Sequence, residues 1–150
     1  MPHMDGCDDA RIHAFGVTLE AMARLNHVLD RSLRDRVGLA QGSFEALLRI
    51  ERTGGQMTMG QLADQVALTS GGVTRMVDRL TEAGFVERRD CESDRRVQYV
   101  AITDAGRAKL TEAVDVHLAD LDREFVGRIA PDELETVVAV MDRLRTAPAS

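Results

Sequence analysis

The sequence predicts a mainly α-helical protein with one small β-wing, and three observations support this fold class. Aromatic residues make up 3% of the 150 residues and tryptophan is absent, so Leu, Val, Ala and Met must build the core. That composition suits helices better than a β-sandwich. Most of the chain repeats its apolar residues with a helical period, whereas residues 85–89 and 97–102 alternate with a period of two. The length fits one domain, or one domain with appended helices.

The first predicted helix covers residues 9–37. Its apolar residues recur about every 3.5 positions, which is typical of an amphipathic helix. Asn26 interrupts the apolar stripe, and Gly38 is the expected stop because glycine readily ends a helix. A shorter helix follows over residues 43–52, and the glycines that come after it break it.

Two helices joined by a tight connection come next. Thr58 and Gln61 fit a capping box and predict a short helix over residues 59–66. After a connection at residues 68–70, the next helix begins near Ser70 and ends at Gly84. Its apolar stripe, which we interpret as core, consists of Val73, Met76, Val77 and Leu80.

The change of period marks a hairpin. Residues 85–89 and 97–102 are the two expected strands, and residues 90–96 join them. A long helix is then expected from residue 104 to about residue 128. Pro131 suits the first position of the last helix, which extends to about residue 146.

This order of elements, a helix, a short turn, a second helix and a hairpin, predicts a winged helix-turn-helix domain over residues 38–103. A major groove about 12 Å wide admits one helix, whose exposed face must be polar. The helix that begins near Ser70 has such a face, and its positive dipole end favours a phosphate. This face consists of Thr69, Ser70, Gly71, Thr74, Arg75, Asp78 and Arg79. The hairpin would carry Arg95 and Arg96 toward the adjacent minor groove, whose negative potential attracts arginine.

The net negative charge of the chain argues against some modes of DNA binding but does not exclude a DNA-binding site. Nineteen basic and 25 acidic residues give a formal net charge of −6, which argues against indiscriminate nucleic-acid binding. Electrostatic screening decays over about 8 Å at physiological salt, so a locally basic surface can still bind DNA.

Residues 57–110 resemble the MarR family of transcriptional regulators. The motifs that carry the resemblance are LTEAGFVERR, then SDRR, and then ITDAGR. The resemblance implies an obligate homodimer in which the helices of residues 9–37 and 104–146 interlock. It implies that two winged domains read a pseudo-palindromic operator in double-stranded DNA. It also implies a repressor that a small anionic or phenolic ligand, or an oxidant, releases from DNA.

The resemblance also implies roles for individual residues. Ser70, Thr74 and Arg75 match the recognition helix, and Asp94, Arg95 and Arg96 match the wing tip. In the family an aspartate at the wing orients the arginine that enters the minor groove. Here Asp94 would hold Arg96, and Arg95 would make a phosphate contact or a second groove contact. For Arg88 and Arg89, phosphate contact and pairing within the protein both remain open.

A ligand pocket is expected between the dimerisation helices and the winged domain. From position alone, its candidate residues are Arg11, His13, Arg24, Phe44 and Met57. We expect no cofactor and no metal site, because the nearest candidate cluster, at residues 3–13, lacks the tight ligand pairs that zinc favours.

Other functions have weaker support in the sequence. A winged-helix module that binds proteins instead of DNA would carry a depleted wing, and Arg95 and Arg96 argue against it. A thiol redox sensor would use Cys91 or Cys7, but the acidic neighbours of Cys91 disfavour its thiolate. We expect no enzyme, because the sequence has no P-loop, GxGxxG, GxSxG or HExxH motif.

The location is expected to be the cytoplasm. The first eight residues, expected to be a flexible tail, lack the apolar core of a signal peptide, and no apolar run approaches the roughly 20 residues that a membrane span needs. The two cysteines form no CxxC motif, which is consistent with a reducing compartment.

Overall fold

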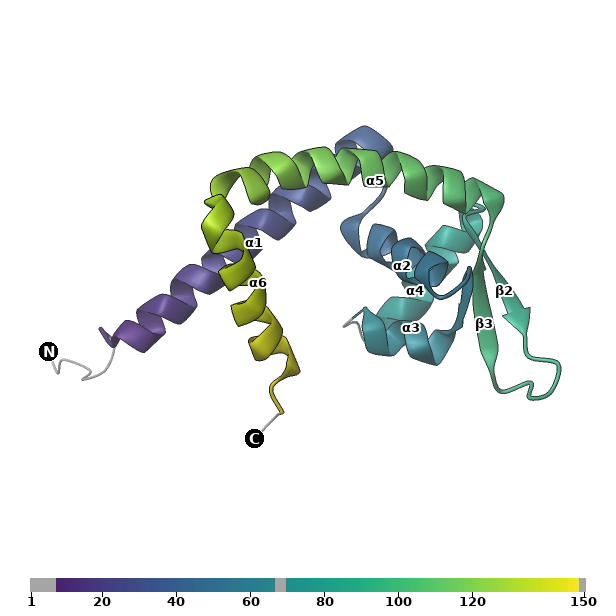
Figure 1. Cartoon of the computed structure of the whole chain (residues 1–150). Helices are drawn as coiled ribbons and strands as arrows, with labels where there is room; N and C mark the ends of the chain where they lie inside the picture. The colour runs from purple at the N-terminus through teal and green to yellow at the C-terminus, as the bar shows by residue number, and fades with distance from the viewer. Residues whose placement is uncertain (1–7, 67–69, 149–150) are drawn as a thin grey trace, which may run out of the picture. The chain divides into compact units, whose positions relative to one another are not determined.

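The computed structural model describes residues 8–66 and 70–148, and it forms two compact units (Figure 1). Residues 30–117 make up what we call the winged unit. The described residues before 30 and after 117 make up the helical unit. The boundaries between the units fall inside two long helices. Within the described part of the chain, no helix has the length and apolar content that a membrane crossing requires.

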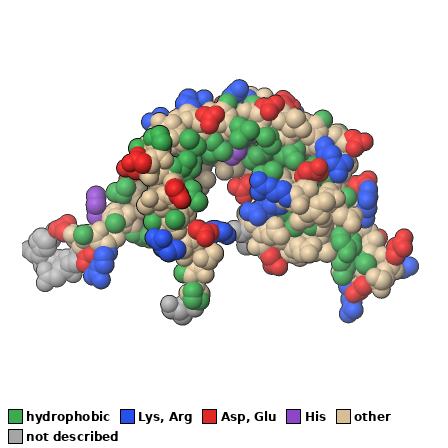
Figure 2. All heavy atoms as spheres, in the orientation of Figure 1, with side chains coloured by type: hydrophobic (Ala, Val, Ile, Leu, Met, Phe, Trp, Pro, Cys, Tyr) green, Lys and Arg blue, Asp and Glu red, His purple; other side chains and the backbone are tan. Residues whose placement is uncertain are grey.

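The helical unit contains parts of two long helices and one complete helix. The long helices are α1 (Ala10–Val37) and α5 (Asp104–Glu124), and the complete one is α6 (Pro131–Thr146). All three expose large apolar side chains, some of which are visible at the surface in Figure 2. Those with more than half of their surface exposed are Ile12, Phe15, Val17, Leu19, Leu118, Val138 and Leu144.

The fifth helix ends earlier than the sequence predicted. It stops at Glu124 instead of continuing to residue 128, and a 3₁₀ turn, η1 (Val126–Arg128), follows. The backbone N–H of Arg128 donates to Phe125 O at 3.1 Å, which is the tighter bonding of a 3₁₀ turn. A Cβ at Gly127 would lie 2.4 Å from Asp122 O, so the 3₁₀ turn requires a glycine at this position. The residue before Pro131 is extended, as proline demands, and α6 then begins at Pro131 as predicted.

A carboxylate in the helical unit holds three arginines. Glu124 accepts hydrogen bonds from Arg24 at 2.8 Å, from Arg123 at 3.1 Å and from Arg128 at 3.2 Å. The Glu124 side chain is 10% exposed. The hydrogen bonds from Arg24 and Arg123 lower the pKa of Glu124 to about 2. The network therefore ties α1 to the end of α5 and to η1.

The winged unit contains the helices α2 (Gln41–Arg52), α3 (Met59–Gln65) and α4 (Ser70–Glu82). Helix α2 begins two residues before the predicted start, because Asp30 in α1 caps it: Asp30 Oδ1 accepts from the backbone N–H of Gln41 at 2.8 Å. The predicted capping box of α3 is confirmed. Gln61 N donates to Thr58 Oγ1 at 3.1 Å, and Thr58 N donates to Gln61 Oε1 at 2.9 Å.

A three-stranded antiparallel sheet completes the winged unit. Its strands are β1 (Gln56–Thr58), β2 (Val86–Asp90) and β3 (Gln98–Ile102), in the order β1-β3-β2. The hairpin of β2 and β3 lies within one residue of the prediction, but β1 was not predicted. A strand of three residues is too short to show alternation, and it exists because β3 offers it a free edge. Both Met57 and its partner Val100 are buried in the core.

The core of the winged unit joins all of its helices to one face of the sheet. Four residues of α4, predicted as core, are at most 2% exposed: Val73, Met76, Val77 and Leu80. They pack in one cluster with Leu47 and Ile50 of α2, with Leu62 of α3 and with Val86 and Val100 of the sheet. Because the apolar residues hold one side of α4 against the core, the polar side of the helix faces the solvent.

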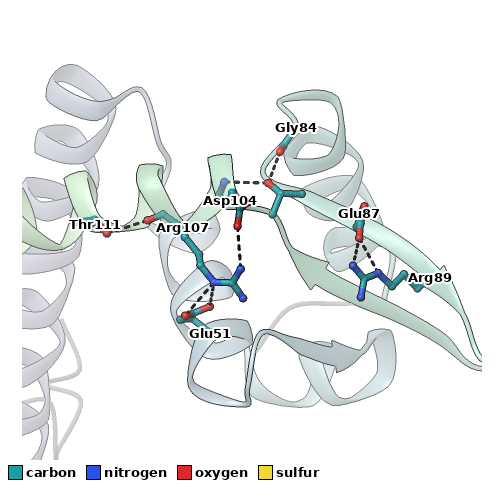
Figure 3. Close-up of polar contacts among 9 residues, drawn as sticks. Glu51, Gly84, Glu87, Arg89, Asp104, Arg107 and Thr111 are labelled. Carbon is teal, nitrogen blue, oxygen red and sulfur yellow. Dashed lines mark hydrogen bonds and ion pairs between the residues drawn. The ribbon is translucent and has the colours of Figure 1, made fainter.

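The start of α5 is fastened to the hairpin and to α2 by the ITDAGR motif (Figure 3). Thr103 Oγ1 donates to Gly84 O at 2.6 Å and accepts from Gly106 N at 3.0 Å. Arg107 donates through Nε to Glu51 at 3.0 Å. A Cβ at Gly106 would lie 2.1 Å from Phe85 O, so α5 can approach the strand this closely only through a glycine. The motif therefore has an architectural role next to the wing.

Candidate nucleic-acid interface

The exposed face of α4 is the first part of the candidate interface. Gly71, Thr74, Arg75, Asp78 and Arg79 are all exposed, as the sequence predicted for this face. Ser70 is the first residue of α4, while Thr69 lies outside the described residues, as does the side chain of Ser70.

Arg75 is directed toward the beginning of α4. Its Nη1 lies 3.6 Å from the position that a Cβ at Gly71 would occupy. The side chain thus follows the usual direction of helical side chains, toward the N-terminus of the helix. The guanidinium therefore lies beside the first turn, where backbone N–H groups already favour an anion. An arginine and a helix N-terminus at one place form a suitable surface for a phosphate or for the edge of a base.

The wing tip is the second part of the candidate interface. The sequence predicted that Asp94 holds Arg96, and the structure confirms this contact. The Arg96 backbone N–H donates to Asp94 Oδ1 at 3.0 Å, while its guanidinium reaches the same carboxylate at 3.1 and 3.3 Å. These hydrogen bonds lower the pKa of Asp94 below its usual value. The Arg96 side chain is nevertheless 91% exposed, so it is held in place and still accessible.

Arg88 and Arg89 pair within the protein. Arg89 contacts Glu87 on the exposed face of β2 (Figure 3). Arg88 points to the opposite face, on the same side as the buried Val86, and pairs with Asp78 of α4 at 2.6 Å. Asp78 was predicted to lie on the exposed face of α4, but its pairing with Arg88 was not predicted. The period of two in β2 was the available signal, because it puts Arg88 on the side that faces the core.

Cys91 lies at the start of the wing loop, directly after β2, and the influence of its neighbours differs from the prediction. The acidic neighbours were expected to disfavour the thiolate. Instead, hydrogen bonds from Ser93, whose Oγ lies 3.2 Å from the Cys91 Sγ, and from the backbone lower the pKa of the thiol. Asp94 opposes this effect through its charge, but it is the smaller influence. Cys7, the other cysteine, lies outside the described residues.

The five residues predicted to bind a ligand lie in both units. In the helical unit, Arg11 pairs with Asp9 at 2.7 Å, Arg24 pairs with Glu124, and His13 is exposed. In the winged unit, Phe44 and Met57 are core residues with 3% and 2% of their surface exposed. Phe44 packs against His117, with ring centroids 4.8 Å apart. Their role in ligand binding stays a prediction. Over the described residues, no three His, Cys, Asp or Glu side chains are grouped to bind a metal ion.

Comparisons with known proteins agree with this geometry. A model of the MarR family matches residues 39–97. The chain is 30% identical to a relative from Bacillus subtilis (strain 168), described as the uncharacterized HTH-type transcriptional regulator YkoM, over 77% of this chain and 75% of the relative.

Two similar solved structures come from Streptomyces coelicolor. Sco3205, a MarR family transcriptional regulator in complex with DNA, has a TM-score of 0.83 and 25% identity and covers 88% of this chain and 83% of that chain. AbsC, a MarR family transcriptional regulator, has a TM-score of 0.80 and 26% identity and covers 93% of this chain and 97% of that chain. The winged-helix architecture predicted from the sequence is therefore confirmed.

Proposed function

The chain belongs to the MarR family of transcriptional regulators, and from this premise we propose that it represses transcription by binding an operator in double-stranded DNA as a homodimer. Helix α4 would enter the major groove, and the wing tip would reach the adjacent minor groove. The solved complex of Sco3205 with DNA, which is similar to this chain in fold and sequence, supports DNA as the partner.

The observation that carries the proposal is the pair of oriented arginines on α4 and the wing. Arg75 lies over the first turn of α4, and Asp94 holds the exposed Arg96. An arginine that is already held loses less side-chain freedom when it binds, so more of its interaction energy is available for DNA. Arg95, which is exposed and lies between Asp94 and Arg96 in the sequence, would add a phosphate contact.

The apolar surface of the helical unit supports a homodimer. Phe15, Leu19, Val138 and Leu144 are each more than half exposed, and such an amount of apolar surface is uncommon on a monomer. A groove between α1, α5 and α6 is lined by further apolar residues, including Leu25, Phe125, Val137 and Met141. A second copy of the chain would cover this surface, because a two-fold axis brings the same patch of each subunit together.

We also propose that a small anionic or phenolic ligand weakens DNA binding. Arg11, His13 and Arg24 of the helical unit are the residues proposed to bind it, because their cationic side chains can pair with an anionic group. The pairs Arg11–Asp9 and Arg24–Glu124 mean that an anion would compete with a carboxylate for each arginine. Charge-removing variants at Arg11 and Arg24 would then change the ligand concentration needed for release.

A selection experiment tests the proposed function. The protein is incubated with a randomised DNA library, and the enriched duplex is then titrated with the protein in fluorescence anisotropy at fixed salt. The proposal expects enrichment of a pseudo-palindrome and a molar mass of twice 16.5 kDa in sedimentation equilibrium. Failure to enrich any sequence would refute operator binding, and a single-chain mass at the concentrations used would refute the homodimer. Adding phenolic acids to the same titration tests release.

A further inference from the structure

One ion pair connects the recognition helix directly to the wing. Arg88, in the middle of β2, donates through Nη2 to Asp78 Oδ1 of α4 at 2.6 Å. The Arg88 side chain is 27% exposed, so much of it is covered by its surroundings. The contact links two elements that belong to separate parts of the candidate interface.

The strand geometry explains why the link falls at residue 88. Val86, on the same side of β2, is buried in the core, and Glu87 and Arg89 point to the other side and pair with each other. Arg88 is thus the first position after Val86 that faces α4. Beyond Arg88, no residue of β2 or of the wing loop up to Arg96 is buried. Arg88 therefore lies where the wing leaves the body of the winged unit.

A small rotation at this position would have a large effect at the tip. Beyond Arg88, β2 continues to Asp90, and the wing loop then leads to the turn at Arg95 and Arg96. At about 3.3 Å per residue in the strand and less in the loop, the tip lies on the order of 10 Å from Arg88, so a tilt of about 10° would move it by roughly 2 Å, enough to break a hydrogen bond. The distance between Arg75 and Arg96 therefore depends on how firmly β2 is held against α4.

The pair also has an electrostatic effect on α4. Asp78 lies three residues after Arg75, on the exposed face of the helix, and its side chain is 51% exposed. An uncompensated carboxylate on a face directed at DNA would repel phosphates. Arg88 neutralises this charge from the side, without occupying the exposed face itself.

We propose that Asp78 and Arg88 are positioning residues that fix the wing relative to the recognition helix and thereby contribute to operator specificity. This inference rests on the proposed DNA-binding function. A pair that sets geometry should affect binding to the correct sequence much more than binding to an arbitrary one. A pair that only balances charge should affect both equally, because attraction to phosphates does not depend on sequence.

The test uses variants of the full-length chain that separate geometry from charge. The double variant Asp78→Asn/Arg88→Gln removes the ion pair and leaves the net charge unchanged. Arg88→Lys keeps the charge and can keep the single contact. The matched control is Asp35→Asn/Arg31→Gln, which removes another exposed Arg–Asp pair, at 3.6 Å within α1 of the winged unit. Thermal unfolding is measured for every variant, so that loss of folding is recognised.

Each variant is titrated with two duplexes, the one enriched by the wild-type protein from the randomised library and a scrambled duplex of the same composition. The double variant should lose about tenfold or more in affinity for the enriched duplex and less than about twofold for the scrambled one. Arg88→Lys and the control should stay within about threefold of wild type on both.

The inference is overturned if the double variant binds the enriched duplex as wild type does, or if it weakens equally on both duplexes. If thermal unfolding shows that the double variant is not folded, Arg88→Lys decides the test. The inference is then overturned if Arg88→Lys is folded and loses about tenfold or more in affinity for the enriched duplex. If the wild-type protein enriches no duplex, the proposed DNA-binding function itself fails, and the inference fails with it.

Discussion

Replacing Gly106 with alanine tests the close approach of α5 to the hairpin. The new Cβ would lie 2.1 Å from Phe85 O, whereas an ordinary contact between carbon and oxygen is about 3.3 Å. The two backbones would have to part by roughly 1.2 Å. This movement would stretch two hydrogen bonds, from Thr103 N to Phe85 O at 3.0 Å and from Thr103 Oγ1 to Gly84 O at 2.6 Å.

The magnitude follows from these contacts. Overpacking of this kind costs about 1–3 kcal/mol, and each weakened hydrogen bond adds about 1 kcal/mol. Alanine returns up to about 1 kcal/mol, because it is a better helix former than glycine. We therefore expect Gly106→Ala to lower the free energy of unfolding by about 2–4 kcal/mol.

Urea unfolding followed by circular dichroism measures this change. Gly42→Ala is the matched control, because Gly42 also lies in the first turn of a helix and its added Cβ would meet no atom within 4 Å. The control should be neutral or slightly stabilising. The reasoning would be refuted if Gly106→Ala were as stable as wild type, or if both variants changed stability by the same amount.

Three further predictions concern the charged groups. The pKa of Glu124 is lowered to about 2, so its ion pairs stabilise the fold above the ordinary pKa near 4.5, and this contribution is lost as the pH falls from 4.5 toward 2. Glu124→Gln should remove this part of the pH dependence of the urea midpoint, and an unchanged acid profile would contradict the assignment. Ser93→Ala should raise the pKa of the Cys91 thiol, which a shift of the iodoacetamide pH–rate profile to higher pH would reveal and an unmoved profile would exclude. Asp94→Asn should weaken operator binding although it removes a negative charge, and tighter binding in the anisotropy titration would show that Asp94 does not act by holding Arg96.

The elements that could be predicted from the sequence are those whose causes lie close together in the chain. The capping box at Thr58 and Gln61 involves residues three positions apart, and Gly84 ends α4 with its φ of +77°. The Asp94–Arg96 contact spans two residues. In each case the interacting groups are neighbours in the sequence, so the motif itself contains the geometry.

The elements that could not be predicted depend on partners far away in the chain. Strand β1 needs the edge of β3, the first turn of α2 needs Asp30 of α1, and Arg88 needs Asp78 of α4. Each of these contacts forms only after packing has brought two elements together. The early end of α5 has a different cause, since its apolar period continues through Phe125 while the tight turn at Gly127 interrupts the helix.

The most direct test of operator binding through an oriented wing arginine is the affinity of Arg96→Ala for the enriched duplex at fixed salt. Arg31→Ala, which removes the same charge from an exposed arginine of α1, is the reference. Arg96→Ala should lose about 1–3 kcal/mol of binding free energy, whereas Arg31→Ala should stay close to wild type. Equal affinities for the two variants would contradict the placement of Arg96 in the DNA groove.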